Sequence, residues 1–475
     1  MFVRLIDFMS EAVWSIPTVA LIALTGLWFT VKMRCLQITS FKEMLRALRK
    51  NLFSGGTRRA IESISTALAA TVGTGSVSGV ATALTIGGAG AIFWLWVSAF
   101  LGMAVAYAEG VLSIKYRSGK KGGIMYSIRD GLKEPFAAAV YAAFTLLASF
   151  GMGSMAQTNA GTQAISAEFS VQPVIIGAVF AIVAALCVFS KRDFTGKACS
   201  VFLPVLSVAY ICVTLWVIIV NYKNIPSAFE MIFSSAFGLR PIAGGAAGYA
   251  VKQAISTGFK RGIFSNEAGL GTTAAIHAEA QGISPHEQGL MNMFEVITDT
   301  FIICTLTALC ILTSGAQNSG LDGAELVTTA CKIAFGDISG KIVAISICGF
   351  SLATVMGWSK IGLGAADYLG GKTRITVYKL AYVAAAFAGS VVSLDIAWKI
   401  SDIFNGMMIF PCTIALILLR KEITGAREEE NYSRPVEPKP FSPRSESGSS
   451  SASQTSGKIT GVTTICANRS PGSKM

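Results

Sequence analysis

Residues 71–90 read TVGTGSVSGVATALTIGGAG, with six glycines and no charge inside a long apolar stretch. A second run, GIFSNEAGLGTT at 262–273, interrupts another apolar stretch about five predicted spans later. Lipid offers no partner to the N–H and C=O groups that an unwound helix frees, so a break is tolerated where it lines a cavity or holds a polar ligand. Close packing against a neighbour would explain the first run alone equally well. The pair of runs favours two broken membrane helices.

The composition places the chain in a lipid bilayer. Of its 475 residues, 52% are hydrophobic and only 14% are charged, which is far from the balance of a soluble domain. A hydrocarbon core about 30 Å thick needs roughly 20 apolar residues for each helical crossing. We predict an all-α membrane protein with about eleven such segments, at residues 12–31, 61–85, 90–114, 136–159, 172–190, 200–221, 244–277, 288–314, 340–366, 376–395 and 397–419.

The net charge of +12 could indicate a nucleic-acid partner, but its distribution indicates a membrane protein with basic cytoplasmic loops. Lys and Arg gather after the first, third and fifth segments and at the carboxyl terminus, whereas the loop near 160–171 has none. This alternation predicts an amino terminus outside and a carboxyl terminus in the cytoplasm, with no nucleic-acid partner. From about residue 424 the chain turns rich in Ser, Pro, Lys and Glu, which predicts a disordered tail.

Glycine-interrupted segments at corresponding places in two halves indicate an inverted-repeat transporter with its binding site near the bilayer midplane. A half-helix that begins at a break directs its amides and positive dipole end toward an anion such as a carboxylate. The carbonyls that end the other half can hold a cation. An amino acid zwitterion with a metal ion would satisfy both ends.

Other classes of function have weaker support in the residues. Gly73 and Gly75 form GxG, but Gly79 comes one residue too late for the dinucleotide fingerprint. A membrane protease would need a base beside Ser76 or Ser78, and the two histidines lie near a cytoplasmic edge. No metal cluster, phosphate loop or nucleotide motif indicates a primary pump, and we expect no enzymatic activity. A channel remains the competing class, distinguished by flux that does not saturate.

Several motifs resemble those of the alanine or glycine:cation symporter family of bacteria and archaea. They are TVGTGSVSGVATA, GGAGAIFWLWVSAFLGMAVAYAE, KRGIFSNEAGLGT, FEVITDT and ATVMGWS, in the family's order, and the likeness runs from about 15 to 420. The resemblance implies the leucine-transporter fold, a five-plus-five inverted repeat preceded by one extra helix. It also implies sodium-coupled uptake of small neutral amino acids such as alanine and glycine, in a bacterial plasma membrane.

The resemblance also implies substrate-binding residues. The substrate carboxylate would bind the backbone around Gly73, Thr74 and Gly75, and the ammonium group would face the carbonyls of an unwound Phe264–Ser265–Asn266 segment. The polar residue that reaches the substrate would be Gln157. Thr354 and Trp358 stand four apart, on one helical face, and Trp358 with Phe264 would restrict the pocket to a methyl-sized side chain.

The cation ligands depart from the family's pattern at two positions. Ser76 replaces the usual Asn, and Ala353 replaces a Ser, so oxygen ligands are reduced or removed. The carbonyls of Ala69 and Val72, with Ser76 and Thr354, would form the remaining metal site, because sodium prefers several hard oxygens. Sodium is the expected cation, and a proton-coupled or exchange carrier of the same fold is the alternative.

Charged residues inside the apolar segments raise further hypotheses. Lys360 could titrate or act as a fixed surrogate for a missing cation, although snorkelling toward water is the simpler interpretation. Arg261 and Glu267 flank the second break and could form a gating or structural ion pair. Beyond helix pairing, no role is assigned to the remaining acidic residues in or near the spans, Glu109, Glu295, Asp299 and Asp402.

The sequence thus predicts four regions. Residues 1–59 form an extra membrane helix and a basic cytoplasmic loop, 60–222 the first five-helix repeat, 223–422 the second, and 423–475 a disordered cytoplasmic tail. The predicted partners are a small neutral amino acid and the lipid bilayer, and we expect a monomer that works by alternating access.

Overall fold

The computed structural model describes residues 2–53, 73–119, 121–190, 194–238, 245–278 and 282–433. Within these ranges the regular structure is helical, apart from an isolated bridge between Ser118 and Lys121, so the all-α prediction is confirmed. Each of the predicted apolar segments overlaps a helix. Seven helices of the described part are long and apolar enough to cross a membrane.

The first half begins with helices α1 Phe2–Val13, α2 Ile16–Lys32, α3 Leu36–Thr39 and α4 Phe41–Phe53. After the first glycine run come η1 Gly75–Gly79, α6 Val80–Gly87, α7 Gly90–Lys115, α8 Ile124–Tyr126 and η2 Ser127–Gly131. They are followed by α9 Pro135–Phe150, η3 Gly151–Met155, α10 Ala156–Phe169, α11 Pro173–Phe189 and α12 Phe194–Val220.

The second half continues with η4 Tyr222–Asn224, α13 Ile225–Ala236, α14 Gly245–Asn266 and α15 Thr272–His277. Next are α16 Pro285–Val296, η5 Ile297–Cys304, α17 Thr305–Ser314, η6 Ala316–Asn318 and α18 Gly323–Phe335. The last helices are α19 Asp337–Leu369, α20 Lys372–Val391, α21 Leu394–Leu418 and α22 Arg420–Ser433.

Local sequence sets several helix boundaries. α9, α11 and α16 each begin with proline, whose fixed φ suits the first turn and whose missing N–H would have no partner there. At the start of α16, the Ser284 hydroxyl also accepts the amide of Glu287 at 3.1 Å. Gly315, directly after α17, has a positive φ of 79° that favours glycine.

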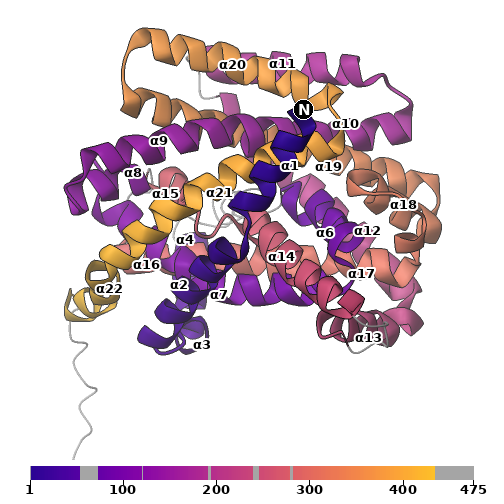
Figure 1. The fold of residues 1–475 in the computed structure, drawn as a ribbon, viewed down its shortest axis with the longest axis horizontal. Helices are drawn as coiled ribbons and strands as arrows, with labels where there is room; N and C mark the ends of the chain where they lie inside the picture. Colours follow the sequence, from indigo (N-terminus) through magenta and orange to yellow (C-terminus); the bar gives the residue numbers. More distant parts are fainter. Residues whose placement is uncertain are drawn as a thin grey trace, which may run out of the picture. The chain divides into compact units, whose positions relative to one another are not determined.

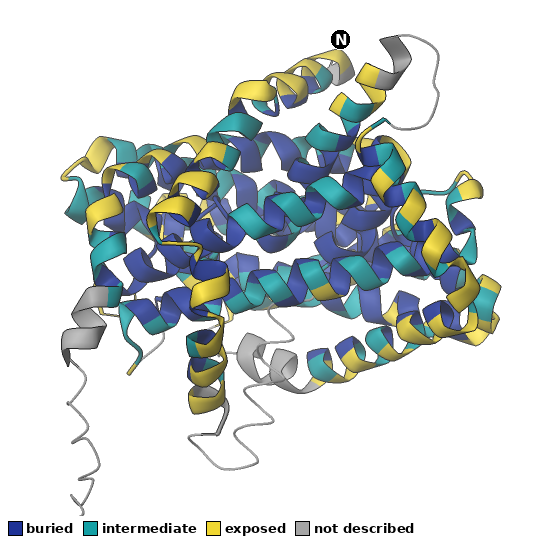
Figure 2. Ribbon diagram, turned by 90° about the horizontal axis from the view of Figure 1, so that it is seen from below, coloured by how far each residue is buried: buried dark blue, intermediate teal, exposed yellow. Residues whose placement is uncertain are grey.

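The helices of the two halves pack on one another in a related pattern (Figure 1). α7 contacts α14 and α16, α10 contacts α19, and α11 lies along α20. In addition, α9 packs against α21 while α12 packs against α19. The amino-terminal helix α1 crosses α21. Buried residues concentrate where these helices meet, and exposed ones lie on the outward sides (Figure 2).

Two predicted boundaries are wrong. The connection expected near 160–171 is helical as far as Phe169, because α10 continues η3 without a stop signal until Ser170. The tail expected to be disordered from residue 423 is helical through Ser433, since α22 continues with helix-favouring Lys, Glu, Ala and Arg residues. Residues 434–475 lie outside the described part of the chain.

Candidate functional site

Within the described residues, a helix begins in the first glycine run. Gly73 is not helical, Thr74 bends the chain, and Gly75 starts the π-helical turn η1. Among the described residues, no acceptor pairs with the backbone amides of Gly73, Thr74 or Gly75. The carbonyls that directly precede these amides in the chain belong to residues 54–72, which lie outside the described part. Ala69 and Val72, the predicted carbonyl ligands, lie outside the described residues.

The second glycine run is a true break. α14 ends at Asn266 and α15 begins at Thr272. Between them the backbone takes positive φ values at Glu267 (57°), Gly269 (90°) and Gly271 (76°), which is why glycine recurs here. The break lies at 267–271, so the expectation that 264–266 are unwound is wrong.

Phe264, Ser265 and Asn266 instead form the last turn of α14. Their carbonyls still resemble the predicted ones, because the end of a helix leaves C=O groups without amide partners. Within the described residues, no backbone N–H donates to these three carbonyls.

The two breaks touch each other at Gly75. A Cβ added there would lie 2.9 Å from the Cα of Ser265 and 3.2 Å from Cδ1 of Phe264. A Cβ at Gly73 would lie 3.8 Å from Oγ1 of Thr354 on α19. Tertiary structure therefore brings together residues that are almost 300 positions apart, and glycine is required because two backbones meet here.

Two further predicted residues lie near the breaks, Gln157 on α10 and Trp358 on α19. The Thr74 hydroxyl donates to Oε1 of Gln157, whose Nε2 donates to the carbonyl of Met152 at 2.9 Å. Trp358 packs against Gly153, where a Cβ would lie 2.5 Å from the Cβ of Trp358. Both predicted residues therefore face the breaks, Gln157 through Thr74 and Trp358 through its neighbour Glu267.

Glu267 pairs differently from the prediction. Its carboxylate accepts the indole N–H of Trp358 at 3.2 Å and the hydroxyl of Thr272. Arg261 instead pairs with Asp402 of α21, at 3.0 and 3.3 Å. The expected Arg261–Glu267 pair is wrong because Arg261 lies on the helical side of the break, facing α21.

A layer of aromatic rings separates that ion pair from the first break. The rings of Phe264 and Trp398 lie 4.5 Å apart between centroids, and the Arg261 guanidinium stacks 4.3 Å over Trp398. On the other side, Trp398 lies 3.4 Å from the position of a Cβ at Gly79. Lys260 joins the pair through a 2.6 Å contact with Asp402.

Asp299 gathers hydroxyl groups from both breaks. Its Oδ2 accepts the hydroxyls of Ser265 at 2.6 Å and Thr300 at 3.0 Å, and Ser76 also interacts with this carboxylate. Its Oδ1 is buried and has no hydrogen-bond partner. Carboxylate and hydroxyl oxygens are the donors that hard cations such as sodium prefer. The residues therefore fit a small cation here, with Asp299 supplying the charge that Ser76 and Thr300 lack.

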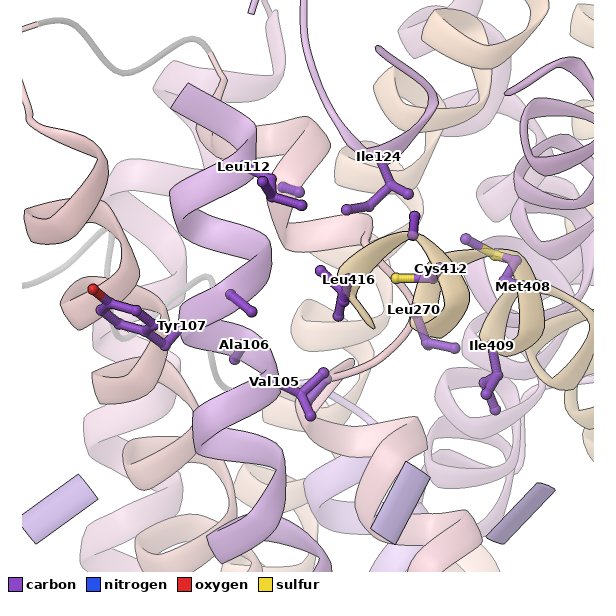
Figure 3. Close-up of a cluster of buried hydrophobic side chains, with 14 of the residues drawn as sticks. Val105, Ala106, Tyr107, Leu112, Ile124, Leu270, Met408, Ile409, Cys412 and Leu416 are labelled. Atoms are coloured by element: carbon purple, nitrogen blue, oxygen red, sulfur yellow. The ribbon is translucent and has the colours of Figure 1, made fainter. Parts of the chain in front are cut away.

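The carboxylate of Glu109 on α7 accepts hydrogen bonds from backbone amides of the second break. Its Oε1 accepts the backbone N–H of Gly269 at 2.8 Å and of Gly271 at 3.0 Å, and the Cys412 thiol lies 3.4 Å away. Around it, Leu270 of the break is enclosed by α7 and by Met408, Cys412 and Leu416 of α21 (Figure 3). The carboxylate thus satisfies N–H groups that the break frees in a buried setting.

Two further charged candidates are Lys360 and Glu295. Lys360 is exposed on α19, and it has an interaction of its own, so it is not a solitary buried charge. Glu295 pairs with His277 at 2.8 Å. Ala353, the other departure from the family's pattern, precedes Thr354 on α19 and supplies no side-chain oxygen.

Sequence reasoning missed the roles of Asp299, Glu109 and Trp398. An acidic residue inside an apolar span was a sufficient signal to single out the first two, because such a residue is costly in lipid and usually has a specific partner. No comparable signal marked Trp398, since an aromatic residue in a membrane helix is ordinarily part of the packing.

Comparisons with known proteins identify the family of the chain. The profile described as "Sodium:alanine symporter family" matches residues 1–439. A protein of the archaeon Methanococcus maripaludis named sodium/alanine symporter AgcS is 37% identical over 454 residues, which cover 92% of this chain and 99% of that protein. An uncharacterized transporter of Haemophilus influenzae is 38% identical, covering 86% and 92%. A probable sodium/glutamine symporter, GlnT of Bacillus subtilis, is 33% identical, covering 90% of each chain.

Proposed function

Because the chain belongs to the sodium:alanine symporter family of multi-pass membrane transporters, we propose that it takes up alanine, glycine or a similarly small neutral amino acid together with sodium. The observation that carries the proposal is the meeting of the two breaks at Gly75, where a Cβ would lie 2.9 Å from the Cα of Ser265. The start of η1 and the carbonyl end of α14 meet there, which suits the two ends of a zwitterion.

In this proposal the substrate carboxylate binds the amides of Gly73, Thr74 and Gly75 at the start of η1. The helix dipole and the absence of bulk both favour an anion at that end. The ammonium group binds the carbonyls of Phe264, Ser265 and Asn266 at the end of α14. Thr354 and Gln157 border the same region through Gly73 and Thr74.

The cation site that we propose centres on Asp299, with the hydroxyls of Ser265, Ser76 and Thr300 around it. This site shares Ser76 with the ligand set that the sequence predicted, and it shares the α14 end with the substrate site. A cation at Asp299 and a zwitterion at Ser265 would each favour the other's binding, because both require the same geometry of the last turn of α14.

The packing pattern supports the five-plus-five inverted repeat of the leucine-transporter fold. If α6, α7, α9–α10, α11 and α12 correspond in order to α14–α15, α16–α17, α19, α20 and α21, then the α9–α21 contact corresponds to the α19–α12 contact. The α10–α20 and α19–α11 contacts correspond in the same way. We propose repeats at 60–222 and 223–422 after one extra helix, eleven membrane helices in all. They would rock against each other around the breaks in a monomer with its carboxyl terminus in the cytoplasm.

Uptake of labelled alanine into proteoliposomes tests the proposal directly. An imposed sodium gradient should drive saturable, concentrative uptake, and replacement of sodium by choline at fixed pH should abolish it. Uptake that persists in choline and follows an imposed proton gradient would establish the proton-coupled alternative. Flux that neither saturates nor concentrates alanine would indicate a channel.

The cation site is tested with Asp299→Asn, which keeps the shape and removes the charge. Charged hydrogen-bonding groups contribute about 1.5–3 kcal/mol each, so the sodium concentration for half-maximal uptake should rise about 10- to 150-fold. Asp337→Asn, which removes the same charge from an exposed carboxylate at the start of α19, is the matched control and should leave sodium dependence unchanged. An unaltered sodium dependence in Asp299→Asn would exclude this carboxylate as the ligand.

A further inference from the structure

The short helix α4 divides into a docked side and an open side. On the docked side, Met44 and Ala47 are buried, while Glu43 lies 3.6 Å from His286 and Lys50 lies 2.7 Å from Glu287. These contacts attach α4 to the start of α16. They fix the rotation of α4 about its own axis, so the remaining residues face away from the described helices.

The open side of α4 carries an apolar stripe beside a basic one. Phe41 and Leu45 are 43% and 44% exposed, and Leu48, which is partly exposed, follows at helical spacing on the same side. Next to this stripe stand the exposed side chains of Lys42, Arg46 and Arg49, without any acidic residue among them. We call these six residues the open face of α4.

The connection between α2 and α4 turns the chain, so that α4 does not continue the direction of α2. After α2 ends at Lys32, Arg34 and Cys35 both take left-handed conformations, with φ values of 55° and 53°, which are unfavourable for residues with a Cβ. Gln37 then anchors the next turn, donating to Thr30 at 2.6 Å and to the carbonyl of Phe100 at 3.1 Å. A sharp, anchored turn directly after a membrane helix is what a helix lying along the membrane surface requires.

We propose that the open face of α4 binds anionic phospholipid of the membrane that surrounds the protein. Phe41, Leu45 and Leu48 would insert between acyl chains, and Lys42, Arg46 and Arg49 would contact the phosphate groups. An exposed apolar stripe flanked by three cations, for which the described residues provide no carboxylate partner, matches the charge and the amphipathic character of that lipid. The inference rests on the membrane location that the family establishes, and it does not depend on which amino acid is transported.

Native mass spectrometry of the full-length protein in detergent tests the proposal. Dioleoylphosphatidylglycerol, dioleoylphosphatidylcholine and glycerophosphoglycerol are titrated separately. The anionic lipid should bind more tightly than the zwitterionic one, and the headgroup without acyl chains should bind far more weakly. In the variant K42Q/R46Q/R49Q, binding of the anionic lipid should weaken about 10- to 100-fold, since each basic residue near an anionic surface contributes about fivefold. In F41S/L45S, both lipids should be retained less well.

The matched control removes three exposed lysines elsewhere, in K223Q/K252Q/K341Q, and should bind the anionic lipid as the natural protein does. Equal weakening in this control and in K42Q/R46Q/R49Q would overturn the proposal, because net charge alone would then explain the binding. So would binding of glycerophosphoglycerol that equals binding of the lipid. A K42Q/R46Q/R49Q variant that is folded, by its melting temperature, and still binds the anionic lipid normally would overturn it as well. Because transport is not measured, none of these results depends on the proposed function.

Discussion

The two helix breaks differ in the hydrogen-bond acceptors of their backbone amides. At the first break, the N–H groups of Gly73, Thr74 and Gly75 have no acceptor among the described residues, whereas at the second break Glu109 accepts from Gly269 and Gly271. Each break frees similar backbone groups in a buried setting, where unpaired amides are costly. The comparison teaches that the protein's own carboxylate closes the second break, whereas no carboxylate of the described residues closes the first.

The largest expected effect comes from filling the space between the breaks. Gly75→Ala would place a methyl group against the backbone of Ser265, and because neither backbone can yield, uptake of alanine should fall by about 100-fold or more. The measurement is initial uptake into proteoliposomes, normalised to inserted protein. Gly248→Ala, at a site with nothing within 4 Å of the new Cβ, is the control. Normal uptake by the Gly75 variant would mean that the breaks do not meet during transport.

Removal of the built-in carboxylate should have the next largest effect. Glu109→Gln keeps one oxygen acceptor but loses the charge, so the amides of Gly269 and Gly271 are held more weakly. We expect a fall in the maximal uptake rate of about 10- to 100-fold, from the loss of about 1.5–3 kcal/mol, with a lower melting temperature. Glu230→Gln, at an exposed position on α13, should change neither quantity appreciably. If Glu109→Gln transports and melts as the natural protein does, the contrast between the two breaks has no functional meaning.

A smaller effect is expected at Trp358, beside the second break. Trp358→Ala should enlarge the side-chain region and shift the ratio of 2-aminobutyrate to alanine uptake by about tenfold, because one methylene is worth about 1–3 kcal/mol. Trp358→Phe keeps a ring and removes only the N–H that Glu267 accepts, and selectivity should remain close to normal. An unchanged ratio in the alanine variant would remove Trp358 from the pocket wall.

The smallest effect should follow from Lys360→Gln. This side chain is exposed on α19, and an exposed charge contributes little, so uptake should change by about twofold or less and its sodium dependence should persist. Loss of sodium dependence in this variant would restore Lys360 as a coupling residue. Cation coupling would then depend on the Lys360 charge as well as on the residues of the two breaks.

The course of the chain explains why some site residues could be predicted and others could not. Gly73, Gly75 and Gly269 were predictable because glycine in an apolar span conflicts with helix formation, and lipid makes the conflict costly. The roles of Asp299 and Glu109 were not predictable, because a buried acid in a span signals that a partner exists without identifying it. The error at Arg261 and Glu267 has the same origin, since proximity in sequence is no guide to which charges meet across helices.

By itself, the sequence determined that this protein is helical, that it belongs in a bilayer and that glycine runs interrupt two of its apolar segments, because apolar runs and glycines act locally on the backbone. Only the tertiary structure decided that Gly75 meets Ser265, that Asp299 gathers hydroxyls from both breaks and that Glu109 closes one of them. Those contacts join residues far apart in the chain. They depend on how side chains of different helices pack at short range, which the periodicity of any one helix does not specify.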